Sequence, residues 1–157
     1  MSPLDVILNI AVSLAATAAF CFLFDIPKRH VIFCALLGSA GWMLYILLTP
    51  VCGQVIATFA AACAAVLLSR ILAVVRKCPA NVLIIPGIIP LVPGSAIYYS
   101  AYSLVTGDNA QAASYGLLTL KIALAIVIGI LVVSAIPFPK ARSKRQVDTA
   151  GQNSIEK

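Results

Sequence analysis

The sequence predicts an all-α integral membrane protein with five transmembrane helices. Its 157 residues are 62% hydrophobic and only 10% charged, with a mean hydropathy of +1.05, whereas soluble domains carry roughly 25% charged residues. The charges separate long neutral tracts, and a bilayer core takes about 20 helical residues. The expected spans are Leu4–Phe24, Val31–Thr49, Gln54–Val75, Asn81–Val105 and Tyr115–Ile136.

Each span has a boundary in the sequence. A loop with Lys28 and Arg29 ends the first span. Residues 49–53 must turn between the second and third, because about 40 unbroken helical residues would overshoot any bilayer. The fourth span lies in the 30 uncharged residues between Lys77 and Asp108. The fifth span follows and completes a transmembrane domain over residues 1–137.

The basic residues predict the orientation. Lys and Arg are absent from the N-terminus, from residues 50–53 and from residues 106–114. They occur instead in the alternate loops and in the tail, as Lys28, Arg29, Arg70, Arg76, Lys77, Lys140, Arg142, Lys144 and Arg145. The positive-inside rule therefore places the N-terminus outside and the C-terminus inside. Residues 138–157 are expected to form a basic, disordered cytoplasmic tail.

The fourth span is predicted to break at Pro86–Gly94. Pro86, Pro90 and Pro93 lie within eight residues, and each removes a backbone N–H and its helical hydrogen bond. Hydrocarbon cannot satisfy the freed carbonyls, so such backbone must be buried in protein or line a watery cavity. Broken helices near the bilayer midplane form solute sites in transporters. The alternative is a kink that serves packing alone.

A half-helix is expected to begin at Pro93, since proline suits the first helical position. The N–H groups of Gly94, Ser95 and Ala96 would then be unpaired inside the membrane, where they favour a carboxylate. The half-helix also carries a polar-aromatic face. The predicted solute-binding residues are Pro86, Gly87, Pro90, Pro93, Gly94, Ser95, Tyr98, Tyr102 and, as a counter-ion in the fifth span, Lys121. Lys121 lies near enough to the outer end to snorkel instead.

Small residues and cysteines in the apolar spans are expected to pack helices together. Small side chains in the second and third spans let helices approach closely, and the packing residues expected from this are Gly38, Gly41, Ala57 and Ala61. The five cysteines are scattered singly, which favours apolar fillers over a metal site. The residues offer no catalytic set, no cofactor motif and no nucleic-acid signal, because the basic residues sit at span ends.

The proline-glycine run resembles the threonine/serine exporter family, specifically its small, C-terminal-type half. The resemblance rests on Pro86–Gly94, then Tyr98, Tyr99 and 106–108, with support upstream from 26–29 and 34–41. It covers about residues 20–137 and implies gradient-driven export of small amino acids, or of related organic acids such as dicarboxylates, across a bacterial inner membrane. It also implies a larger membrane protein as partner subunit. Five spans that begin outside would complement five that begin inside.

Two further functions remain open on the sequence. One is a non-transporting assembly or stability subunit. For it, changes at Gly38, Gly41 and Ala61 would impair complex formation, while Tyr98, Tyr102 and Lys121 would tolerate substitution. The other is a homo-oligomeric channel.

Overall fold

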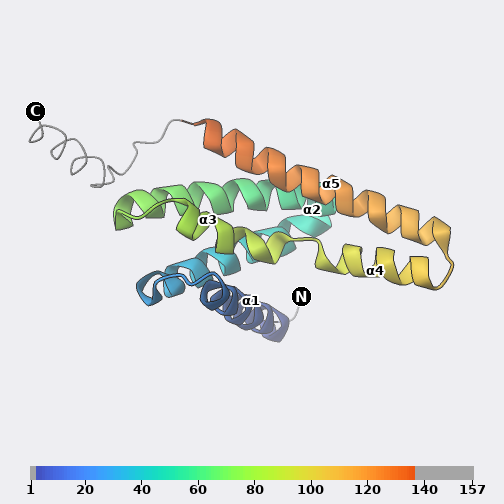
Figure 1. The fold of residues 1–157 in the computed structure, drawn as a ribbon, viewed down its shortest axis with the longest axis horizontal. Helices are drawn as coiled ribbons and strands as arrows, with labels where there is room; N and C mark the ends of the chain where they lie inside the picture. Colours follow the sequence, from blue (N-terminus) through green and yellow to red (C-terminus); the bar gives the residue numbers. More distant parts are fainter. Residues whose placement is uncertain (1–2, 137–157) are drawn as a thin grey trace, which may run out of the picture.

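The computed structural model describes residues 3–136, and this range forms helices and no strand. The prediction of an all-helical chain is thereby confirmed. The expected tail, residues 138–157, lies outside the described residues. Figure 1 shows the elements in chain order, which are α1 (Pro3–Leu23), α2 (Lys28–Arg76), α3 (Asn81–Ile88), the short 3-10 helix η1 (Ile89–Leu91), α4 (Gly94–Val105) and α5 (Asn109–Ala135).

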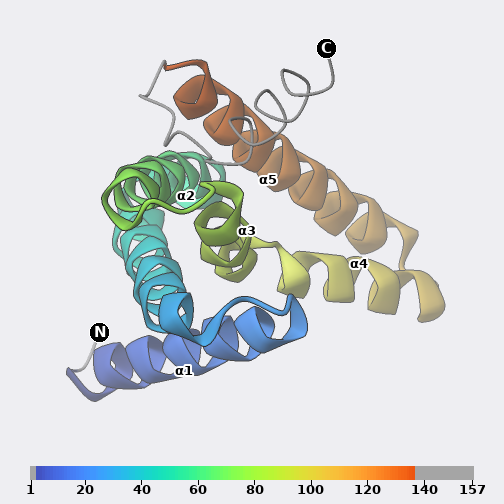
Figure 2. The same ribbon diagram turned by 60° about the vertical axis from the view of Figure 1, so that its left-hand side comes forward.

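Helix α2 is two helical arms that fold back on each other at Gly53. Gly53 has φ 78° and ψ 165°, a conformation outside the helical region that glycine adopts without steric cost. A Cβ placed on Gly41 would lie 3.6 Å from the Cβ of Ala65, although the two would be about 36 Å apart in a straight helix. The arms therefore pack side by side, as Figure 2 shows. The turn predicted over residues 49–53 is narrower than expected, because helical structure continues through Pro50 to Cys52.

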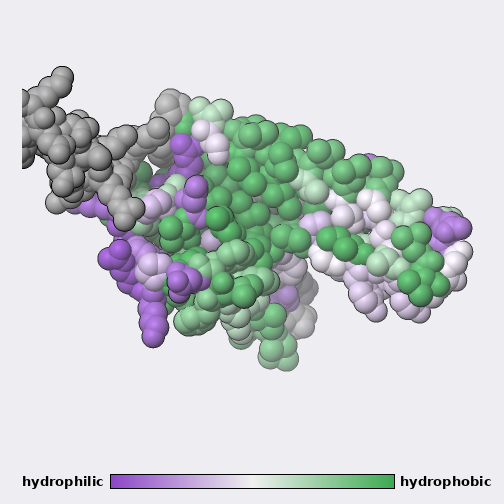
Figure 3. Space-filling view, in the orientation of Figure 1, coloured by the Kyte–Doolittle hydropathy of each residue, from purple (hydrophilic) through white to green (hydrophobic). Residues whose placement is uncertain are grey.

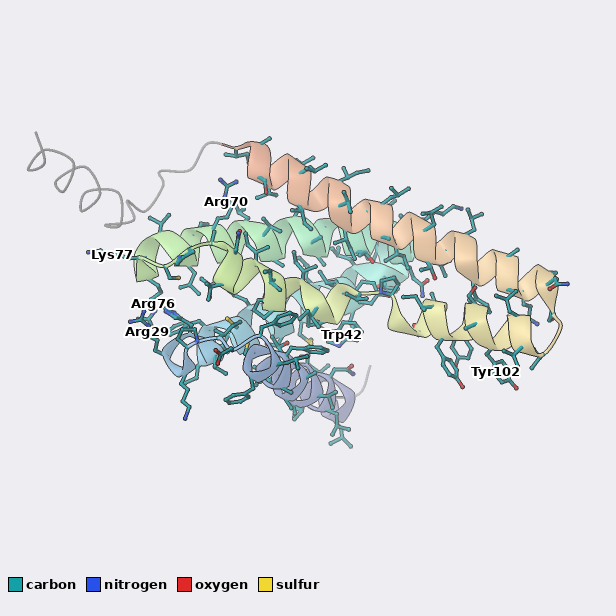
Figure 4. All side chains as sticks on the ribbon, viewed as in Figure 1. Arg29, Trp42, Arg70, Arg76, Lys77 and Tyr102 are labelled. Atoms are coloured by element: carbon teal, nitrogen blue, oxygen red, sulfur yellow. The ribbon has the colours of Figure 1, made fainter. Side chains whose placement is uncertain are left out.

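The end of the bundle where α1 meets α2 has its own core. Three cysteines from three segments, Cys21, Cys34 and Cys78, are buried there with Leu37, Ala73 and Leu83. Among residues 3–136, no group of three or more His, Cys, Asp or Glu side chains is arranged to hold a metal ion. In Figure 4 the labelled Arg29, Arg70, Arg76 and Lys77 all lie toward this end of the molecule, opposite the loop that joins α4 to α5.

Helix α5 packs along the second arm of α2 through Gly129. A Cβ on Gly129 would lie 3.1 Å from the Cβ of Ala62 and 3.3 Å from the carbonyl oxygen of Phe59. The backbones therefore approach closely there, as small residues permit between membrane helices. Ala61, Ala62, Leu91, Ile122 and Ile126 form the core beside this contact.

Helices α3 and α4 form one bent pair. The axis of Asn81–Leu91, which contains α3 and η1, is bent by 48° from the axis of α4. The two segments together are long and apolar enough for one membrane span. Helices α1, α2 and α5 are each long and apolar enough on their own. Counting the two arms of α2 separately would give the five predicted spans. The number of crossings and the orientation stay predictions.

The turn between α4 and α5 is fixed by Gly107 and Asp108. Gly107 has φ 82°, and the Asp108 carboxylate accepts a hydrogen bond from the Gln111 N–H at 3.0 Å as the N-cap of α5.

We expect Asp108→Ala to lower the free energy of unfolding by about 1 kcal/mol, because it leaves the Gln111 N–H without its cap. Asp108→Ser should retain most of the stability, and thermal unfolding in detergent measures both. Equal stability of Asp108→Ala and the wild type would contradict the role.

Candidate functional site

The three prolines leave carbonyls unpaired, and the structure satisfies some of them. The Val82 carbonyl, which loses its helical donor to Pro86, accepts from the Cys34 thiol at 3.6 Å. The Ile89 carbonyl, which loses its donor to Pro93, accepts from the Val92 N–H at 3.1 Å through the 3-10 turn. The first part of the break is therefore closed by protein groups.

The start of α4 differs in one respect from the prediction. Pro93 is the N-cap, with φ −76° and ψ 57°, and Gly94 is the first helical residue. The Gly94 N–H donates to the Val92 carbonyl at 2.7 Å, so it is paired, contrary to expectation, by a tight turn around Pro93. Among the described residues, the N–H groups of Ser95 and Ala96 have no acceptor and no side-chain cap.

These two N–H groups belong to residues that line a cavity of about 410 Å³. Its walls come from both arms of α2 near the turn at Gly53, from the break, and from α4 and α5. The lining residues are Trp42, Tyr45, Gln54, Thr58, residues 90–96, Tyr99, Tyr115, Leu118 and Ile122. None of them is charged. The cavity thus combines the positive end of a helix dipole with aromatic and neutral polar walls.

The aromatic side chains form two pairs. Trp42 and Tyr45 have ring centroids 5.3 Å apart, and Tyr99 and Tyr115 have centroids 5.5 Å apart. The Trp42 indole N–H donates to the Asn9 side-chain oxygen at 3.3 Å, which ties the first arm of α2 to α1. Figure 4 shows Trp42 in the middle of the bundle. Electron-rich ring faces attract cations, so the walls complement the anion-favouring start of α4.

The structure gathers only some of the predicted solute-binding residues at the cavity. Pro90, Pro93, Gly94 and Ser95 line it. Pro86 and Gly87 are buried instead, and a Cβ on Gly87 would lie 3.5 Å from the Ser69 hydroxyl. Both residues therefore pack α3 against α2.

Tyr98, Tyr102 and Lys121 lie outside the cavity. Tyr98 is 62% exposed and Tyr102 56% exposed, and Figure 4 shows Tyr102 pointing away from α5. Lys121 is exposed, on the same face of α5 as Leu117 and Leu124, which are also exposed. A role for these three residues in solute binding stays a prediction from the sequence.

The predicted packing residues are all buried, and the contacts of the glycines lie within the chain. Gly38 faces Thr17 of α1, and Gly41 faces Ala65 and the Gly87 carbonyl. Ala57 and Ala61 are fully buried in the second arm of α2. The glycines thus serve the internal fold, so a defect from changing them does not by itself indicate a partner surface.

Several cavity residues were not expected from the sequence. Trp42, Tyr45, Gln54, Thr58 and Tyr115 line the cavity, and none of them is among the solute-binding residues that the sequence predicts. The sequence offered one signal, the turn at Gly53. A chain that folds back there brings the end of the second span and the start of the third span close together, and both could lie beside the break. Which of their faces meet the break depends on helix rotation.

Most of the chain matches a known family. The family model described as Threonine/Serine exporter, ThrE, matches residues 9–136, a range that includes the break, the cavity and all of α2. No curated protein and no solved structure matches the chain. The match covers well over half of the sequence, and the chain therefore belongs to the threonine/serine exporter family.

Proposed function

We propose that this chain is the small membrane subunit of a gradient-driven exporter in a bacterial inner membrane. The exported solute is a small amino acid such as threonine or serine, or a related carboxylic acid such as a dicarboxylate. The proposal is supported by family membership and by one structural observation: the unpaired N–H groups of Ser95 and Ala96 at an uncharged cavity. A carboxylate is the ligand that such a helix start favours.

An amino acid suits the cavity walls better than a dicarboxylate. Its carboxylate would bind at the start of α4, and its ammonium group would lie against the aromatic faces. A second carboxylate would meet no cation, because no described lining residue is charged. Measuring intracellular threonine, serine and succinate with and without the gene decides between them, and unchanged levels of all three would refute export.

The partner subunit is proposed from the exposed face of α4. This helix packs mainly on α5, and both views show the two helices extending beyond the rest of the bundle. In Figure 3 this part of the surface is paler than the strongly hydrophobic bundle. A larger membrane protein would cover the face that carries Tyr98 and Tyr102. Co-purification in mild detergent tests this, and a lone homo-oligomer would contradict it.

Tyr99 and Tyr98 provide a matched pair of variants. Tyr99 lines the cavity, and its ring centroid lies 5.5 Å from that of Tyr115. Tyr98 lies outside the cavity lining, and the exposed fractions of Tyr98 and Tyr99 are 62% and 49%. We expect Tyr99→Leu to weaken solute affinity in export about tenfold, which corresponds to ~1.4 kcal/mol. Tyr98→Leu should leave that affinity unchanged. Export kinetics in vesicles measure both, and an equal effect of the two changes would contradict the placement of the solute.

A further inference from the structure

A second cavity, of about 480 Å³, lies between α1 and the first arm of α2. Its lining residues are Ala11, Leu14, Ala15, Ala18, Val31, Ile32, Ala35 and Leu36. Every one of these side chains is apolar, and the alanines leave a hollow because a methyl group fills little of the space between two helices. Ile32 and Leu36 are 68% and 54% exposed, so the cavity is an open groove, the α1–α2 groove.

Lys28 lies directly beyond one end of the α1–α2 groove. It precedes Ile32 by four residues and Leu36 by eight, so the three side chains follow one face of α2. Four residues of helix rise about 6 Å. A molecule whose apolar chain lay in the groove would therefore place its head beside the Lys28 ammonium group.

Positive charge is concentrated at this end of the groove. Lys28 and Arg29 begin α2, whereas Arg76 and Lys77 end it, and all four are exposed. Figure 4 shows the labelled Arg29, Arg76 and Lys77 toward the same end of the molecule, and Figure 3 shows hydrophilic surface there next to hydrophobic surface. Asp25 is the only acidic residue between residues 6 and 107. The cluster therefore has an excess of positive charge.

The start of α2 also offers hydrogen-bond donors without acceptors. Pro27 is the N-cap and provides no side-chain acceptor, and the N–H groups of Lys28 and Arg29 donate to no described residue. The Arg29 Nε–H donates to the His30 Nε2 at 3.0 Å, so the neutral ring carries its proton on Nδ1. This Nδ1 is buried and has no partner among residues 3–136.

The two ends of α2 act on the same ring. Burial lowers the pKa of the His30 imidazole, and the charges of Arg29 and Arg76 lower it further. The guanidinium carbon of Arg76 lies 3.7 Å from the centroid of the Phe33 ring, one turn of α2 beyond Arg29. Unpaired N–H groups, a positive helix end and converging arginines together favour a phosphate.

The arrangement of apolar wall and charge points to an amphiphile. The α1–α2 groove is apolar throughout, and the basic residues lie at one end of it. A molecule with an apolar chain and a single anionic head matches this distribution. A membrane helix from another protein is apolar along its contact and would leave the charges unused. Basic pockets between membrane helices bind the head groups of anionic lipids in this way.

We propose that the α1–α2 groove binds one anionic phospholipid. An acyl chain lies between the two helices, and Lys28, Arg29, Arg76 and the N–H groups at the start of α2 hold the phosphate. The bound lipid thereby ties α1 to α2. The inference goes beyond the proposed function and does not depend on it, because the groove shares no lining residue with the solute cavity.

Two lipids that differ only in head-group charge test the site. The full chain is purified in mild detergent with any subunit that accompanies it and is titrated with phosphatidylglycerol or phosphatidylethanolamine carrying the same oleoyl chains. Native mass spectrometry should show saturable binding of phosphatidylglycerol and about tenfold weaker binding of phosphatidylethanolamine, whose ammonium group cancels the phosphate charge. Equal affinities would overturn the proposal. So would inorganic phosphate that binds as tightly as phosphatidylglycerol, because the groove would then contribute nothing.

Charge variants test the basic end. Lys28→Gln with Arg29→Gln should weaken phosphatidylglycerol binding about fivefold for each charge removed. Binding of phosphatidylethanolamine should be unchanged, which shows that the variant is folded. Lys144→Gln with Arg145→Gln is the matched control, because it removes the same charge from the tail and should leave the affinity at its wild-type value. An equal loss in both double variants would indicate general attraction to anionic lipid and would overturn the site.

A pair of adjacent alanines tests the groove. Ala15 and Ala16 are both exposed, but only Ala15 lines the groove. Ala15→Phe fills the groove and should weaken phosphatidylglycerol binding about tenfold, because the acyl chain loses its apolar contact. Ala16→Phe should have no such effect, and equal affinities of the two variants would contradict the placement of the chain.

A protein occupant of the groove would give a different result. If a helix of another subunit or of a second copy of this chain lay there, Ala15→Phe would release the accompanying subunit or change the oligomeric state. Either change with an unaltered affinity for phosphatidylglycerol would assign the groove to a protein and overturn the lipid site.

Discussion

Replacing Pro90 and Pro93 together by alanine is expected to abolish export while the protein still inserts into the membrane. Alanine at these positions restores N–H groups that can reach the Pro86 and Ile89 carbonyls. The chain can then continue from α3 into α4 as one helix, which removes the 48° bend. The N–H groups of Ser95 and Ala96 would be consumed by ordinary helical bonds, and the cavity would lose its anion-favouring wall.

The stability of this double variant separates loss of function from loss of fold. A proline inside a helix costs about 3 kcal/mol, so the variant should unfold at the same temperature as the wild type or higher. The control is Pro50→Ala with Pro79→Ala, the same chemical change at two positions outside the cavity lining. Export is measured in cells, and membrane insertion by fractionation. Normal export by Pro90→Ala with Pro93→Ala would refute the site.

Gly38→Ala is expected to be the most destabilising of the small substitutions. The new methyl group would lie 2.8 Å from Cγ2 of Thr17 and closer still to its hydroxyl oxygen. Thr17 is fully buried and donates to the Ser13 carbonyl at 2.8 Å, so it has little room to move. Either α1 shifts away from α2 or this hydrogen bond breaks. Overpacking of this kind costs about 1–3 kcal/mol.

A double-variant cycle tests the assignment to this single contact. Thr17→Ala removes the two nearest atoms, and the remaining Cβ would lie 3.1 Å from the new methyl group. Gly38→Ala with Thr17→Ala should therefore recover most of the lost stability. Gly41→Ala is the matched control, because its methyl group would meet Ala65 at 3.6 Å, an ordinary contact. Thermal unfolding in detergent measures the wild type and the four variants, Thr17→Ala alone included. Gly38→Ala and Gly41→Ala with equal unfolding temperatures would contradict the prediction.

Much of the helix pattern could be predicted because it follows from local chemistry. Pro86, Pro90 and Pro93 lack the N–H that a continuous helix needs, and that holds in any surroundings. The start of the half-helix after the break was therefore predictable to within one residue, whereas α3 continues through Pro86 to Ile88, so the break begins later than predicted. The turn at Gly53 was predictable because the bilayer limits helix length. The hydrogen bond from the Gly94 N–H to the Val92 carbonyl could not be predicted, because it depends on the dihedral angles of Pro93.

The sequence by itself determined an all-helical membrane chain, a break in its fourth apolar stretch and membership in an exporter family. The tertiary structure alone decided which residues meet at that break. It moved Pro86 and Gly87 into the core, left Tyr98 and Lys121 outside the cavity, and brought Trp42, Gln54 and Tyr115 to its walls. Local composition sets where a helix starts and stops, whereas the rotation and register of packed helices depend on contacts such as Gly129 with Ala62, which join residues far apart in the chain.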